Sequence, residues 1–263
     1  MFARIRKLLG SFATADNRTW WLRRKLMNKL DRRQIAVAWQ EFYERLPGEQ
    51  LINEAFDRRH GTETAEEVPL VETGVSAEDA IHGNGYYRPV WEHAFHAALA
   101  TLKIDFEGFT FVDIGSGKGK ILMMAADYPF ARIVGVEYSP ALHATAQRNL
   151  SIYRSPSQRC TDLRSVHADA CDCQLPPGPL VCLIFNALDP GTLKKFVRNV
   201  EGDLISRNTP AYFLYCNLRH IVEMDDGLDA VRGLRLLTHS SKLVVLGNSA
   251  ARRQWQERAR SGR

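Results

Sequence analysis

The stretch FVDIGSGKGK, residues 111–120, constrains the fold of this 263-residue chain more than any other feature. An apolar run leads into Asp113, and glycines follow at positions 115, 117 and 119 before a helical pattern begins. Glycine lacks a β-carbon, so it permits a tight turn and lets other atoms approach the backbone closely. The pattern therefore predicts a buried strand, a glycine turn, and a helix whose first N–H groups are free to meet a ligand.

Strand and helix patterns alternate along the chain from about residue 90. The predicted buried strands are apolar on both faces, as in a parallel sheet covered by helices on both sides, and they include residues 109–115, 131–138, 180–186 and 210–217. Residues 234–248 predict two strands around a turn. We therefore expect an α/β fold: a doubly wound, mostly parallel seven-stranded sheet with an antiparallel C-terminal hairpin, plus a helical N-terminal extension.

Composition divides the chain into four parts. We expect a basic helical N-terminal extension at 1–60, an irregular lid or linker at 61–89, the α/β domain at 90–248 and a basic C-terminal tail at 249–263. Residues 61–89 are called the lid segment below. It is acidic and rich in Gly and Thr, which is typical of irregular structure.

Charge follows the same division. Of the net charge of +5, residues 1–33 carry +8 and residues 249–263 carry +4, which leaves −7 on the body of the chain. Basic ends of this kind fit contact with an anionic surface, such as nucleic acid, a membrane or an acidic protein. Solvated helix faces are the alternative.

The next predicted strand after the glycine turn ends in Glu137, 24 positions after Asp113. In doubly wound sheets ligands bind beyond the carboxyl ends of the strands, where a carboxylate can accept hydrogen bonds from both ribose hydroxyls. The pair predicts a nucleoside site. The spacing G-x-G-x-G differs from the dinucleotide fingerprint, and Ile121 after Lys120 excludes a P-loop. Asp113 would repel a pyrophosphate and suits a cationic group.

The motif D-x-G-x-G-x-G, followed by a strand that ends in Glu, resembles that of class I S-adenosylmethionine-dependent methyltransferases. The resemblance covers about residues 85–248 and implies S-adenosyl-L-methionine as cofactor and methyl transfer as the activity. In VHADA, it implies that Asp169 reads the adenine amino group and that the N–H of Ala170 reads the ring. The cofactor-binding residues implied are Asp113, Gly115, Ser116, Gly117, Gly119, Glu137, Tyr138, Asp169 and Ala170.

The segments YYRP, FVDIGSGKGK and LIFN are also similar to a bacterial group of uncharacterised class I methyltransferases and, more distantly, to non-SET lysine methyltransferases. This resemblance implies that Tyr87 and Pro89 close the cofactor site and that Asn186 faces the transferred methyl group. Asn186 and Tyr87 are the predicted catalytic residues, with Asp189 a further positioning candidate or a helix N-cap.

The resemblance does not decide which class of molecule accepts the methyl group. Where enzymes that methylate amino groups of nucleic acids carry [DN]-P-P-[YFW], this chain has Asn-Ala-Leu-Asp, which favours a protein side chain, lysine above all. A nucleic-acid acceptor is the first alternative. The second is a protein docked on a membrane by its N-terminal basic helix, with a secondary cofactor site.

Five cysteines without a paired framework favour reduced thiols and a cytoplasmic protein, with peripheral membrane docking as the alternative. Cys171 and Cys173 lack the second pair that a structural zinc site shows, so no metal is expected. No apolar segment approaches the roughly 20 residues that span a bilayer. The Arg-rich start also fits an organellar transit peptide.

Overall fold

The computed structural model describes residues 49–82, 85–185, 187–216, 232–240 and 243–261. The helical pattern predicted for residues 1–48 lies outside these ranges, and so does the predicted catalytic residue Asn186.

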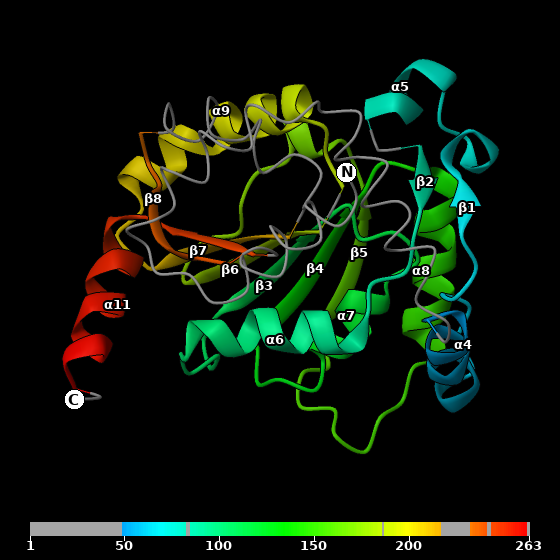
Figure 1. Cartoon of the computed structure of the whole chain (residues 1–263), viewed down its shortest axis with the longest axis horizontal. Coiled ribbons are helices and arrows are strands. Elements are labelled where there is room, and N and C mark those ends of the chain that lie inside the picture. Colours follow the sequence, from blue (N-terminus) through cyan, green and yellow to red (C-terminus); the bar gives the residue numbers. More distant parts are fainter. Residues whose placement is uncertain (1–48, 83–84, 186, 217–231, 241–242, 262–263) are drawn as a thin grey trace, which may run out of the picture.

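The described residues form a central seven-stranded sheet in the order β5-β4-β3-β6-β7-β9-β8 (Figure 1). Its strands are β3 (Thr110–Ile114), β4 (Arg132–Glu137), β5 (Leu163–His167), β6 (Leu180–Phe185), β7 (Ala211–Cys216), β8 (Arg235–His239) and β9 (Val244–Gly247). β3 to β7 run parallel, and β8 and β9 form an antiparallel hairpin that pairs with β7 through β9. The predicted fold class is confirmed. Because β3 lies between β4 and β6, the strand order reverses at β3, which is where such sheets bind ligands.

Helices cover both faces of the sheet. They are α6 (Glu92–Leu102), α7 (Lys120–Ala125), α8 (Pro140–Ile152), α9 (Pro190–Ser206) and α11 (Ser249–Ser261). Figure 1 shows α6 and α7 on one side of the sheet and α9 on the other. Successive strand residues point to opposite faces. Phe111 accordingly belongs to the core beneath α6 and α7, and Val112 to the core beneath α9.

The residues before the sheet form short elements along one end of it. These are α4 (Glu49–His60), β1 (Val68–Pro69), η3 (Leu70–Thr73), α5 (Ala77–His82) and β2 (Tyr86–Tyr87), with β1 and β2 paired antiparallel. α4 is joined to α7, because the ammonium of Lys120 donates to Oδ1 of Asn53 at 2.6 Å and lies 5.0 Å from the ring centroid of Phe56. Burial lowers the pKa of Lys120 to about 8.

Two helix ends illustrate how local sequence sets the elements. Ser139 caps α8, with its hydroxyl accepting from the N–H of Leu142 at 3.2 Å and proline in the first turn, as the sequence predicts. The residues predicted as a basic tail form α11, which packs by the buried Ala250 and Ala251 while Arg252 and Arg253 stay exposed.

Among the described residues, no helix combines the length and the apolar character that crossing a membrane requires. The thiols of all five cysteines are free.

Removing the ring of Phe111 should destabilise the fold. This side chain is 0% exposed and packs its ring 5.1 Å from that of Phe130 and 6.0 Å from that of Phe95. We expect Phe111→Ala to lower the free energy of unfolding by about 3–5 kcal/mol in urea denaturation. Ile205→Ala, at a side chain that is 60% exposed, is the control and should stay within about 0.5 kcal/mol of the wild type. Equal losses would contradict this account of the core.

Candidate active site at the carboxyl edge of the sheet

The glycine turn joins β3 to α7. The N–H groups of Gly115 and Ser116 both donate to the carbonyl of Val136 on β4, at 2.8 and 3.1 Å, so the turn is fastened to the neighbouring strand. Gly115, Gly117 and Gly119 have φ angles of +75°, +54° and +83°. All three lie in the left-handed region, which other residues adopt at a cost. The alternate glycines of the motif are therefore required by the backbone itself.

Two distant segments approach the turn where side chains are missing. A β-carbon on Gly117 would lie 2.4 Å from Cε2 of Tyr87, so the tyrosine ring lies directly against this glycine. A β-carbon on Gly115 would lie 2.3 Å from Cβ of Ala187, in the loop that follows β6. The turn is thus the place where β2 of the lid segment and the β6 loop converge.

Asp113 is a buried carboxylate with no hydrogen-bond partner among the described residues. It is 0% exposed, and within the described ranges neither of its oxygens has a hydrogen-bond partner. Burial, with the charge of Glu137 adding to it, raises the pKa of Asp113 well above its usual value. The hydroxyl of Ser116 in the turn is also buried without a partner among the same residues. Buried polar groups are normally satisfied, so these atoms point to a polar ligand.

Glu137 ends β4 beside them and is partly satisfied by the backbone. Its two oxygens accept from the N–H groups of Gly117 at 2.7 Å and Ser139 at 2.8 Å. Burial raises the pKa of Glu137, and the backbone hydrogen bonds from Ser139 and Gly117 oppose that rise. A backbone hydrogen bond from Tyr138 acts in the same direction. A carboxylate offers about four lone-pair sites, so Glu137 is held in place and keeps acceptor capacity for a ligand.

The other predicted cofactor residues continue along the same edge. Tyr138 follows Glu137, is 46% exposed, and donates its hydroxyl to Oδ2 of Asp79 on α5 at 3.2 Å. Asp169 is exposed two residues beyond β5, and its side chain accepts from the N–H of Cys171 at 2.7 Å. Ala170 is buried at the start of the short helix η4 (Ala170–Asp172). Since β5 pairs with β4, with His167 opposite Glu137, these residues share one edge with the carboxylates.

The predicted catalytic residues have different surroundings. The hydroxyl of Tyr87 donates to the carbonyl of Thr64 at 2.8 Å, and burial raises its pKa well above the usual value. Tyr87 therefore meets the glycine turn with the Cδ2–Cε2 edge of its ring, while its hydroxyl is held by the lid segment. Asn186 lies outside the described residues, although its neighbour Ala187 contacts the turn at Gly115. Asp189 caps α9 by accepting from the N–H of Gly191 at 2.8 Å, in agreement with the N-cap alternative.

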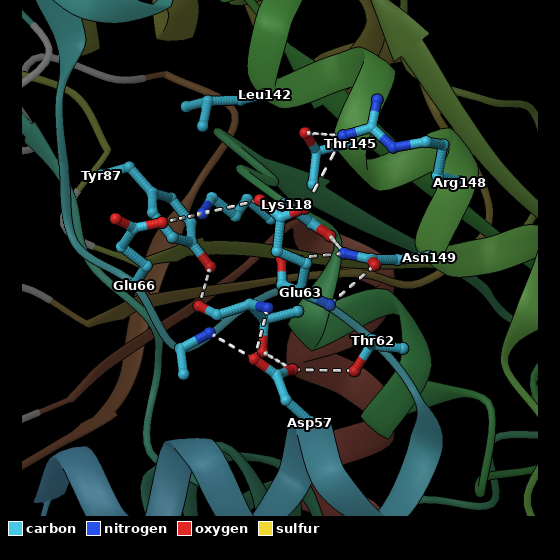
Figure 2. Close-up of polar contacts among 12 residues, drawn as sticks. Asp57, Thr62, Glu63, Glu66, Tyr87, Lys118, Leu142, Thr145, Arg148 and Asn149 are labelled. Atoms are coloured by element: carbon cyan, nitrogen blue, oxygen red, sulfur yellow. Dashed lines mark hydrogen bonds and ion pairs between the residues drawn. The ribbon is translucent and has the colours of Figure 1, made fainter.

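Sequence reasoning missed the polar groups that surround Tyr87. Lys118, inside the glycine turn, is only 3% exposed, and its ammonium lies 5.4 Å from the Tyr87 ring centroid and 3.5 Å from Oε1 of Glu63 (Figure 2). Asn149 on α8 is 2% exposed and bonds to both the turn and the lid segment. The position of Lys118 between two glycines of the motif was the one sequence feature that could have indicated its burial. No sequence feature indicated the contacts of Asn149.

The assembled edge can hold a ligand of defined chemistry. An unpaired buried carboxylate favours a cationic group, because the opposite charge would offset the cost of burying it. A second carboxylate, fixed by the backbone at the end of the next strand, fits a pair of hydroxyls. The glycine turn lets such a ligand lie against the backbone.

Comparison with known proteins gives similarity in fold. No protein-family model matches the chain, and no curated protein matches its sequence. Among solved structures, the methyltransferase domain of bacterial CtHen1 is 17% identical with a TM-score of 0.44 and covers 59% of this chain and 96% of that domain. Magnesium protoporphyrin IX methyltransferase from Synechocystis PCC 6803, solved with bound S-adenosylmethionine, is 14% identical with a TM-score of 0.44 and covers 60% and 79%.

A methyltransferase from Thiobacillus denitrificans, solved with S-adenosylhomocysteine, is 16% identical with a TM-score of 0.34. The match covers 46% of this chain and 47% of that one, so it spans about half of the neighbour's length. Identities and TM-scores this low do not assign an activity to this chain.

The contact between Gly117 and Tyr87 makes a testable difference between two glycines. Gly117→Ala should displace the tyrosine ring and lower the free energy of unfolding by about 1–3 kcal/mol, because it combines a positive φ with a steric clash. Gly108 has a φ of +79° and no atom of the described residues within 4 Å of an added β-carbon. Gly108→Ala is therefore the control for backbone strain alone. Equal losses in urea denaturation would show that the ring contact has no weight.

Proposed function

We propose that this protein is an S-adenosylmethionine-dependent methyltransferase. The observation that carries the proposal is the pair of buried carboxylates at the ends of adjacent strands. Asp113 has no hydrogen-bond partner in the described part of the chain, and Glu137 is fixed by backbone N–H groups. The cofactor combines an ammonium group, a sulfonium and a ribose diol in one molecule. Asp113 fits the cationic part, Glu137 fits the diol, and the glycine turn fits the chain between them.

The bound cofactor supplies an activated methyl group, so the protein needs mainly to align an acceptor and exclude water. Asp113 and Glu137 would fix the ends of the ligand. Tyr87 and Ala187, which contact the turn from two sides, would limit its movement and its exposure to water. An amine acceptor must also lose its proton, and desolvation in a closed site lowers the pKa of an amine.

For the acceptor we infer a protein lysine side chain. The loop after β6 departs from the sequence of nucleic-acid amino methyltransferases, as Asn186 to Asp189 read Asn-Ala-Leu-Asp. The lid segment beside the site exposes acidic side chains, among them Glu66, Glu72 and Glu78. A negative rim favours the approach of a cationic partner and disfavours a polyanion.

The burial of Asp113 predicts opposite effects on stability and on binding. Because its folded-state pKa lies above the unfolded value near 3.8, this carboxyl destabilises the fold increasingly as the pH rises past that value. Asp113→Asn should therefore raise the free energy of unfolding at pH 8 by about 0.5–2 kcal/mol. It should also weaken cofactor binding about 10- to 100-fold, by the loss of a charged contact.

Urea denaturation and calorimetric titration with S-adenosylmethionine test both parts. Wild-type affinity should fall as the pH is lowered through the raised pKa of Asp113, and the variant should lose that dependence. Asp162→Asn is the control: hydrogen bonds from Arg164 and Arg132 lower the pKa of Asp162, so this change should lower stability and leave binding intact. Unaltered affinity in Asp113→Asn would refute the cofactor assignment.

Transfer of a labelled methyl group identifies the acceptor. The chain is incubated with labelled S-adenosylmethionine and host lysate fractions, with Gly117→Arg as the control that blocks the turn. We expect label that protease removes and nuclease does not, recovered as methyl-lysine after hydrolysis. Nuclease-sensitive label would instead favour a nucleic-acid acceptor. Cofactor binding without any transfer would favour the membrane-docked protein.

A further inference from the structure

A polar seam joins the lid segment to the glycine turn and α8. Its members are buried although their residue types are usually exposed: Thr64 is 0% exposed, Asn149 2% and Lys118 3%. Figure 2 shows Lys118, Asn149 and Asp57 within one group of polar side chains. An apolar interface could also join the lid segment to α8, so polar groups at this position are unusual.

Asn149 bridges two chain segments far apart in sequence. Its amide donates to the carbonyl of Lys118 at 2.8 Å and to that of Glu63 at 3.2 Å, and its Oδ1 accepts from the N–H of Glu63 at 3.0 Å. One side chain thus fixes the backbone of the turn and that of the lid segment to α8.

Asp57, at the end of α4, holds the next residues of the lid segment. Its carboxylate accepts from the N–H groups of Thr64 and Ala65, both at 2.7 Å, and from the hydroxyls of Thr62 and Thr64, both at 2.8 Å. Four hydrogen bonds on one carboxylate fix the direction of the Thr64 carbonyl. That carbonyl in turn accepts the hydroxyl of Tyr87 at 2.8 Å (Figure 2).

The contacts close a circuit around the turn. Tyr87 lies against Gly117, Lys118 follows Gly117 in the chain, Asn149 links Lys118 to Glu63, and Glu63 precedes Thr64, which holds Tyr87. The ammonium of Lys118 lies near the same tyrosine ring. Because each of these contacts positions the residue that makes the next one, losing one hydrogen bond allows the Tyr87 ring to move away from the turn.

We propose that Asn149 and Asp57 are positioning residues that hold Tyr87 over Gly117 and thereby set how long the cofactor stays bound. The proposal rests on the proposed function, since the ring and the turn are what would enclose the cofactor. A hydrogen-bonded seam adds little net stability when closed, yet leaves costly unpaired groups when half open. The lid segment is therefore expected either to be fully bonded to the turn and α8 or to be fully detached from them. Two such states would allow a ligand to enter and leave in a controlled way.

The chain offers a matched pair of asparagines for the test. Asn248 is 0% exposed, its Oδ1 accepts from the N–H groups of Ala211 and Ala251, and its amide donates to the carbonyls of Arg207 and Thr209. Asn248 lies between β9 and α11, next to Ala211 at the first residue of β7, and so at the edge of the sheet opposite the ligand edge. Asn149→Ala and Asn248→Ala therefore remove the same group from equally buried networks, one in the seam and one away from it.

Dissociation of S-adenosylhomocysteine is measured by stopped-flow competition, beside thermal unfolding and amide hydrogen exchange of residues 62–68. We expect Asn149→Ala to speed dissociation about tenfold or more. Tyr87→Phe, which keeps the ring and removes only its hydrogen bond to Thr64, should speed it about two- to tenfold. Asn149→Ala should also speed exchange at the N–H of Glu63. Asn248→Ala should lower the unfolding temperature and leave dissociation within about twofold of the wild type.

Equal dissociation rates in the two asparagine variants would overturn the proposal, and so would an unchanged rate in Tyr87→Phe. If Asn149→Ala speeds exchange alone, the seam orders the lid segment without governing the cofactor, and the proposed function stands. If the wild type itself fails to bind S-adenosylhomocysteine while its exchange shows a closed seam, the proposed function fails, and the seam is a structural joint only.

Discussion

The three glycines in the turn between β3 and α7, which carry no side chains, are the constraint on which the rest of the site depends. Only there can the Tyr87 ring lie against Gly117 while the N–H of the same glycine reaches the carboxylate of Glu137. The close contact of Gly115 with Ala187 adds the β6 loop to this meeting point. Three segments that are remote in sequence are thus positioned by one short stretch of backbone.

The two carboxylates at this edge are held in different ways, and the difference divides their roles. Glu137 has its direction fixed by two backbone N–H groups, which suits a group that must present acceptors at defined positions. Asp113 has no such support in the described part of the chain, and its burial is a cost that the apolar core on both faces of the sheet offsets. Energetic strain of this kind is typical of sites prepared for a ligand.

The sheet and the site on it could be predicted because their signals are local. Apolar runs, the spacing of glycines, and Ser139 before a proline each lie within a few residues, and the structure confirms the strands and the helix cap. The contacts of Lys118 and Asn149 could not be predicted in this way. Glu63 and Asn149 are 86 positions apart, and no periodic pattern encodes such a pairing. Residue type alone would place a lysine at the surface.

The helical tail shows a second limit of sequence reasoning. Five arginines within residues 249–263 dominate its composition, and they conceal the small apolar contact made by Ala250 and Ala251. A high density of charge indicates which face of a helix is exposed to water. It does not indicate whether the opposite face packs against the protein.

The anchoring of α4 changes what counts as one folding unit. Composition separates the chain near residue 90. In the structure, however, Asp57 on α4 contacts the lid segment, and Asn53 and Phe56 on α4 contact the buried Lys120 of α7. A fragment beginning at Val90 would retain all strands of the central sheet. It would still remove Glu63 and Asn53, which contact the buried ammonium groups of Lys118 and Lys120, and both hydrogen bonds between Asn149 and Glu63. Proteolytic trimming in the lid segment should therefore cost the α/β core its cooperativity, although every residue removed lies outside the sheet.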